Sequence, residues 1–83
     1  MNFEEKAVGA FKIYTGAMEE FGNNAYTASV IVHRVRGAGA PEQVFRCQQL
    51  HDGYRFSSVR AALDEAMDAG IKEVAYRTAG AVA

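Results

Sequence analysis

Residues 57–70 read SSVRAALDEAMDAG, and their apolar side chains recur at the spacing of an α-helix. One apolar stripe results at positions i, i+3, i+4, i+7 and i+8, formed by Val59, Ala62, Leu63, Ala66 and Met67. Ser57 or Ser58 is placed to cap the first turn by accepting a hydrogen bond from a free N–H. Gly70 is placed to end the helix in the left-handed conformation. We therefore predict a helix that ends at Gly70.

Three segments before this helix have β-strand character. Residues 25–36 read AYTASVIVHRVR, a β-rich run bounded by Gly22-Asn23-Asn24 and by the Gly- and Pro-containing residues 37–41. Residues 43–50 form another strand, and Val8–Ala17 a first one that Gly9 and Gly16 weaken. Because the connections are short, we expect an antiparallel meander.

The predicted fold class is α+β, with two layers. A three- or four-stranded antiparallel sheet in the order β-β-β-α carries one helix on one face, with or without a closing strand over Ile71–Arg77. Asn2 and Glu5 are spaced as in a helix capping box, so the secondary structure of the N-terminal segment is ambiguous from the sequence. Residues 1–83 are expected to form one domain, with mobile ends at 1–7 and 78–83.

The core of such a domain is thin. Hydrophobic residues make up 49% of the 83 residues, but fifteen are alanine and only 21 are Val, Ile, Leu, Met or Phe. A chain of this size is marginally stable unless a disulfide, a metal or oligomerisation helps, and the single Cys47 cannot form an internal disulfide. We expect a homodimer. The lone thiol and the acidic N-terminus, with no apolar segment after it, predict a cytoplasmic protein without a membrane span.

Charge is distributed unevenly along the chain. Residues 33–60 carry five Arg against Glu42 and Asp52, a balance of +3, whereas the segments on either side each have a balance of −2. Arginine matches phosphate and carboxylate groups, so this middle segment is a candidate anion-binding region through Arg34, Arg36 and Arg55. The alternative is that acidic and basic segments complement one another within the fold.

Strand alternation predicts which side chains the single helix leaves uncovered. If Phe11, Ile13, Phe45 and Cys47 face the helix, the other face holds a mixed apolar and cationic set. The candidate interaction surface is Tyr14, Ile31, His33, Val35, Val44 and Arg46. Two functions compete for it, homodimerisation and contact with a nucleic acid or an acidic protein partner. A register slip of one residue would exchange the two faces.

The sequence predicts no catalytic site, no metal site and no cofactor. His33, His51, Asp52 and Cys47 lack the paired short spacing of zinc ligands, and Cys47 alternates with Phe45 as a small buried side chain. Gly37-x-Gly39 lies between two strands, whereas a glycine-rich phosphate-binding loop directly precedes a helix, so this segment does not match that motif. We therefore expect a non-catalytic interaction module.

The β-β-β-α order resembles that of double-stranded-RNA-binding domains, whose first helix the N-terminal segment would supply. Their last helix starts with a lysine cluster, where this chain has Ser57-Ser58-Val59-Arg60. Residues 56–66, FSSVRAALDEA, look like the entry of the helix in HicB-type antitoxins, and the last third also resembles small stand-alone bacterial proteins of unassigned role. These resemblances imply the alternative function, a nucleic-acid-contacting or antitoxin-like domain that uses the basic middle segment.

Overall fold

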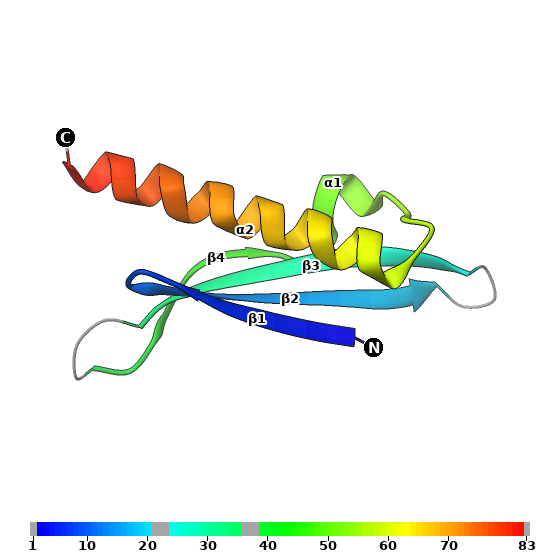
Figure 1. Ribbon diagram of the computed structural model, residues 1–83, viewed down its shortest axis with the longest axis horizontal. Helices are drawn as coiled ribbons and strands as arrows, with labels where there is room; N and C mark the ends of the chain where they lie inside the picture. The colour runs from blue at the N-terminus through cyan, green and yellow to red at the C-terminus, as the bar shows by residue number, and fades with distance from the viewer. Residues whose placement is uncertain (1, 21–23, 36–38, 83) are drawn as a thin grey trace.

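Four antiparallel strands form a sheet, and one long helix packs against it (Figure 1). The computed structural model describes residues 2–20, 24–35 and 39–82. The strands lie side by side in chain order: β1 (Asn2–Val8), β2 (Phe11–Glu20), β3 (Ala25–Arg34) and β4 (Glu42–Cys47). A short turn, α1 (Leu50–Gly53), leads to the long helix α2 (Val59–Val82). The predicted α+β two-layer fold class is confirmed.

The N-terminal segment is a strand, so the helix suggested by the Asn2–Glu5 spacing is wrong. Residues 2–8 pair with β2 over their whole length, from Asn2 opposite Ala17 to Val8 opposite Phe11. Gly9 and Ala10 form the two-residue turn between them, and Gly9 has a φ of +58°. A two-residue hairpin turn favours glycine at such a position. Gly9 therefore lies in the turn between two strands, rather than weakening a single strand over Val8–Ala17.

Helix α2 continues through Gly70, so the predicted helix end and the closing strand over Ile71–Arg77 are both wrong. Gly70 is buried inside the helix, where a Cβ would lie 2.5 Å from Ile13 Cγ2 and 3.2 Å from Val30 Cγ2. The missing side chain allows the helix backbone to approach the sheet closely. Val74, one turn further on, is 5% exposed and extends the packed stripe. Gly70 thus serves close packing and not helix termination.

The start of α2 and the core agree with the sequence prediction. Ser58 Oγ accepts a hydrogen bond from the Ala61 N–H at 3.0 Å, as an N-cap does. Ala62, Leu63 and Ala66 are buried in the predicted stripe. They pack with the fully buried side chains of Ile13, Val30 and Val32, which belong to the sheet face predicted to meet the helix.

The connection between β4 and α2 turns sharply at residues 51–53. His51 and Asp52 have φ angles of 54° and 58°, in the left-handed region, and Leu50 before them is buried. Further along, Phe56 exchanges two backbone hydrogen bonds with Tyr26, at 2.9 and 2.7 Å. This bridge occupies part of the edge of β3 that the short strand β4 does not reach.

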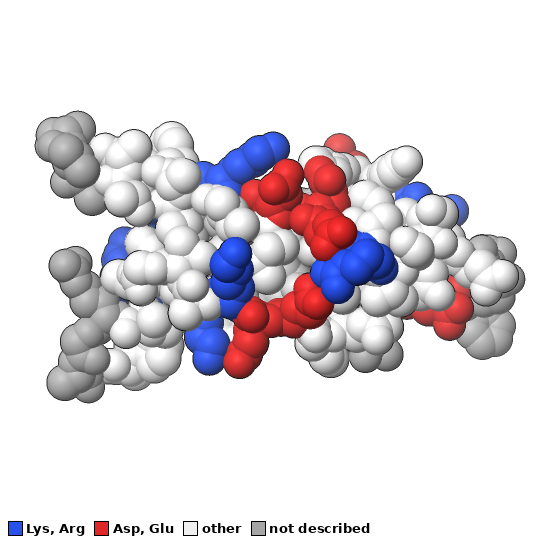
Figure 2. All heavy atoms as spheres, viewed as in Figure 1, with Lys and Arg blue, Asp and Glu red and all other residues white. Residues whose placement is uncertain are grey.

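The surface on the helix side is charged. Figure 2 shows acidic side chains gathered over the middle of the molecule with basic side chains among them. Tyr76 of α2 is 76% exposed on the outside of the helix. Within the described ranges, no helix combines the length and the apolar character needed to cross a membrane.

The packing at Gly70 gives a first prediction. Helix propensity alone makes Gly→Ala stabilising by roughly 1 kcal/mol in a helix interior. At Gly70 the added Cβ meets Ile13, and overpacking of a core costs about 1–3 kcal/mol. Gly70→Ala is therefore expected to lower the free energy of unfolding measured with urea. Ala75→Gly, at an exposed position of α2, is the control for propensity and should cost about 1 kcal/mol. A Gly70→Ala protein more stable than wild type would contradict the close packing.

Candidate interaction surface

The sheet face turned away from α2, called the open face here, is not covered by any element in the described part of the chain. The strand register shows which residues belong to this face, because two residues paired directly across neighbouring strands point to the same side of the sheet. The open face includes Phe3, Glu5, Lys12, Tyr14, Gly16, Met18, Ser29, Ile31, His33 and Arg46, with Val35 at one end. The predicted assignment of Tyr14, Ile31, His33 and Arg46 to one face agrees with this register.

The centre of the open face is a cluster of aromatic and charged side chains. The rings of Tyr14 and His33 meet edge to face with their centroids 5.1 Å apart. Lys12 Nζ lies 5.5 Å from the centroid of the Tyr14 ring and 3.4 Å from Glu5 Oε1. Ile31 lies directly opposite Tyr14 on β3. Each of these side chains is at least partly accessible, so the cluster offers an apolar surface bordered by charge.

Large apolar side chains protrude around this cluster. Phe3 is 72% exposed, Met18 52% and Val35 37%. Phe3 lies opposite Gly16, and its ring is 3.6 Å from the place where a Cβ of Gly16 would be. Val35 extends β3 by one residue, since its N–H donates to Ala10 O at 2.8 Å. Exposed apolar side chains gathered on one face are typical of an interaction site.

Sequence reasoning missed Phe3, Glu5 and Met18. The first two lie on β1, whose residues Glu4, Glu5 and Lys6 are poor strand formers. The available signal was the pair Gly9-Ala10 between Val8 and Phe11, which is a hairpin pattern. Met18 lies beyond the predicted end of the strand at Ala17, because β2 continues to Glu20.

A cavity of about 370 Å³ opens at the β4 side of the open face. Met18, Ser29 and Ile31 line it from β2 and β3, and Arg46–Gln49 line it from the end of β4 and the following turn. The cavity lies where β4 ends at Cys47, opposite Val30, so that Ser29 on β3 has no β4 neighbour in the register. A short edge strand thus creates a hollow in an otherwise continuous sheet.

Val44 belongs to the predicted surface, but the structure packs it against the core cluster on the other side. The register shifts between Val32 and His33, which pair with Phe45 and Gln43, so Val44 is an extra residue in β4. Such a bulge breaks the alternation of side chains. Val44 and Phe45 therefore both pack against the buried core.

The predicted anion contacts do not form a basic patch in the described residues. Arg34 Nη1 lies 3.1 Å from Glu42 Oε1 and above the ring of Phe11, and Arg55 Nε lies 3.6 Å from Glu20 Oε1. Arg36 lies outside the described residues. These two pairs agree with complementary charge within the fold. Arg46 is exposed on the open face and makes no ion pair with any other described residue.

The residues considered for metal or redox chemistry lie apart. Cys47 is half-buried and packs against the core, as its alternation with Phe45 predicted. His51 Nε2 lies 3.1 Å from Glu65 Oε1 at an exposed position. Among the described residues, no group of three or more His, Cys, Asp or Glu side chains is placed to hold a metal ion.

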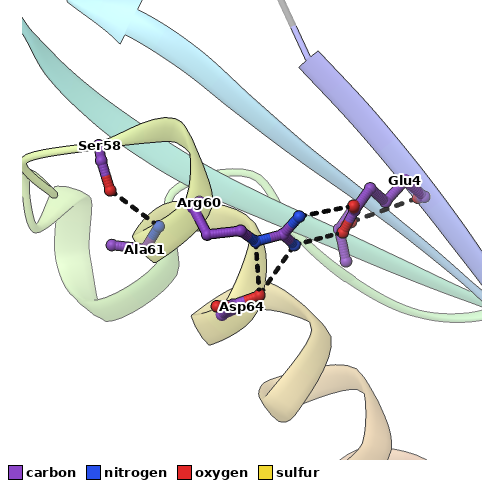
Figure 3. Close-up of polar contacts among 6 residues, drawn as sticks. Glu4, Ser58, Arg60, Ala61 and Asp64 are labelled. Atoms are coloured by element: carbon purple, nitrogen blue, oxygen red, sulfur yellow. Dashed lines mark hydrogen bonds and ion pairs between the residues drawn. The ribbon is translucent and has the colours of Figure 1, made fainter.

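The densest ion-pair cluster joins β1 to α2 on the helix side (Figure 3). Arg60 donates from Nη1 to Glu4 Oε2 at 2.9 Å, from Nη2 to Glu4 Oε1 at 2.6 Å, and from Nε to Asp64 Oδ1 at 2.9 Å. The hydrogen bonds from Arg60 hold the pKa of the Glu4 carboxyl below its ordinary value, and the same bonds raise the pKa of Arg60. Glu4, Arg60 and Asp64 are each paired within the protein, so we interpret this cluster as a structural contact that holds the edge strand β1 to α2. We call these three residues the clamp.

No protein-family model, curated protein or solved structure matches this chain. The resemblances to double-stranded-RNA-binding domains and HicB-type antitoxins therefore rest on element order and on residues 56–66. The observed order departs from the expected one, because a fourth strand precedes the three predicted strands. The segment expected to supply the first helix of an RNA-binding domain is β1.

The clamp predicts a pH-dependent contribution to stability. A carboxyl whose pKa is lower in the folded than in the unfolded state stabilises the fold above its unfolded pKa, and the contribution is lost as pH falls through the folded pKa. Glu4→Gln is expected to lower the melting temperature at neutral pH, and this difference should shrink at about pH 3. Thermal unfolding of both proteins at the two pH values measures it. An equal difference at both pH values would show that the Glu4 charge is not what stabilises β1.

Proposed function

We propose that this protein is a non-catalytic interaction module that forms a homodimer through the open face. The observation that carries the proposal is the uncovered sheet face with Phe3, Met18 and Val35 exposed around Tyr14 and Ile31. An antiparallel sheet with one solvated face normally alternates apolar and polar side chains cleanly. The open face instead has the mixed apolar, aromatic and Arg composition of protein interfaces.

Size supports a second copy as the partner. A chain of 83 residues buries roughly 60–65% of the surface that its unfolded form exposes, so further burial on association adds needed stability. The molecule measures 44 × 25 × 17 Å, and its broad side can supply the roughly 800 Å² per partner of a standard interface. A homodimer needs no other gene product to cover this face.

The open face is a better interface than the free edges of the sheet. The β1 edge carries Glu4, Glu5 and Lys6 in succession, and charged side chains on edge strands oppose pairing with another strand. Strand β4 has only six residues and contains a bulge, which also disfavours edge pairing. We therefore favour face-to-face packing over extension of the sheet.

Nucleic-acid contact is the alternative function. In this alternative, the rings of Tyr14 and His33 stack on the bases of a single-stranded nucleic acid, and Arg46 on the same face neutralises its phosphates. Against this, Arg34 and Arg55 are paired with carboxylates, and Glu5 lies on the same face. We expect no binding of a labelled single-stranded oligonucleotide at low salt, measured by fluorescence anisotropy. Salt-sensitive binding that Arg46→Gln weakens would favour the alternative.

The homodimer predicts the effect of a charge at the centre of the open face. Tyr14→Lys is expected to convert a dimer to a monomer in analytical ultracentrifugation, because the ammonium would be buried in the interface. In the isolated chain the new Lys stands opposite Glu5, so the fold should persist by circular dichroism. Tyr76→Lys, on the exposed side of α2, is the matched control and should remain dimeric. A wild-type monomer at micromolar concentration would exclude the homodimer.

A further inference from the structure

Charge is arranged in a definite order across the middle of the open face. Glu5 on β1 pairs with Tyr14 on β2, Tyr14 with Ile31 on β3, and Ile31 with Arg46 on β4. These four residues therefore form one row perpendicular to the strands, with a carboxylate at one edge and a guanidinium at the other. Neighbouring strands are about 4.8 Å apart, so the two charged edges lie roughly 14 Å from each other.

The neighbouring row differs in shape between its two edges, with a protruding side chain at the β1 edge and a cavity at the β4 side. Phe3 on β1 pairs with Gly16 on β2, and Gly16 pairs with Ser29 on β3. Phe3 protrudes at the β1 edge, 72% exposed, while Ser29 lines the cavity at the β4 side. Both rows thus present at one edge a feature that is complementary to the feature at the other edge.

A twofold axis determines how two such faces meet. If the axis is parallel to the strands, β1 of one subunit lies over β4 of its partner, and each row lies over the same row in reverse order. If the axis is perpendicular to the strands and in the interface plane, β1 lies over the partner's β1, and only the row through which the axis passes lies over itself, in the same order. With the axis through the row of Glu5 and Arg46, the second arrangement places Glu5 over the partner's Glu5 and Arg46 over the partner's Arg46, which is repulsive. With the axis elsewhere, it separates Glu5 from the partner's Arg46, so the two charges do not pair.

We propose that two copies pack open face to open face about a twofold axis parallel to the strands. Glu5 then pairs with the partner's Arg46, Tyr14 packs on the partner's Ile31, and Phe3 enters the cavity of about 370 Å³ beside the partner's Ser29. All contacts occur twice. The inference rests on the proposed homodimer and deepens it, since it assigns the orientation of the partner. The rim charges set this orientation, and the apolar centre supplies most of the burial.

Charge reversal tests the orientation. Glu5→Arg alone and Arg46→Glu alone each create two like-charge contacts per dimer, and we expect each variant to self-associate roughly tenfold or more weakly than wild type. A mixture of the two variants restores opposite charges at both contacts, Arg with Glu at the changed pair and Glu5 with Arg46 at the unchanged one. The mixture should therefore form a heterodimer with an affinity near that of wild type, measured by sedimentation velocity with one variant labelled.

Controls separate orientation from net charge and from misfolding. Asp68→Arg and Lys72→Glu make the same charge changes at exposed positions of α2, and neither should alter dimerisation. Rescue in the mixture shows that both open-face variants are folded. Two results would overturn the orientation while still supporting the homodimer. In the first, wild type is a dimer and both single variants self-associate as strongly as wild type. In the second, the single variants self-associate more weakly but their mixture does not restore binding. A wild-type monomer would overturn both proposals.

Discussion

The close contact between α2 and the sheet at Gly70 determines how the rest of this small protein is arranged. A helix backbone can lie directly on Ile13 and Val30 only where it has no side chain, and Gly70 provides that place in the middle of the packed stripe. With 24 residues, and about 1.5 Å of rise per residue, α2 extends for roughly 36 Å along the sheet. One helix held this closely packs on one face of the sheet, mainly over β2 and β3, and in the described part of the chain it leaves the other face uncovered.

The remaining features follow from this two-layer arrangement. Edge strand β1 contacts the helix layer through the ion pair of Glu4 with Arg60, which holds it against β2 from outside the core. The side chains of β1 that alternate with Glu4 must then lie on the open face, and they include Phe3 and Glu5. The same strand therefore stabilises the fold on one side and contributes the most exposed aromatic ring on the other.

Most of the fold, and part of the candidate surface, can be predicted from local pattern. The helical stripe of residues 59–67 and the alternation of residues 25–36 are strong signals, and the second places Ile31 and His33 on one face. Alternation with Ile13 and with Phe45 adds Tyr14 and Arg46 to that face. The failures have physical reasons. Gly70 has the sequence of a helix end but acts in tertiary packing, and β1 is charged because it is an edge strand. The position of Val44 depends on a bulge, and no local pattern in the sequence predicts one there.

We propose the open face, and not the outer face of α2, as the surface on which a second copy packs. Isotope-filtered NMR on a mixture of equal amounts of labelled and unlabelled protein detects only contacts between subunits. Packing through the open face predicts intermolecular contacts from the Tyr14 ring to the methyl groups of Ile31, and from the Phe3 ring to Ser29. Intermolecular contacts confined to α2 residues such as Tyr76, or none at any concentration, would contradict it.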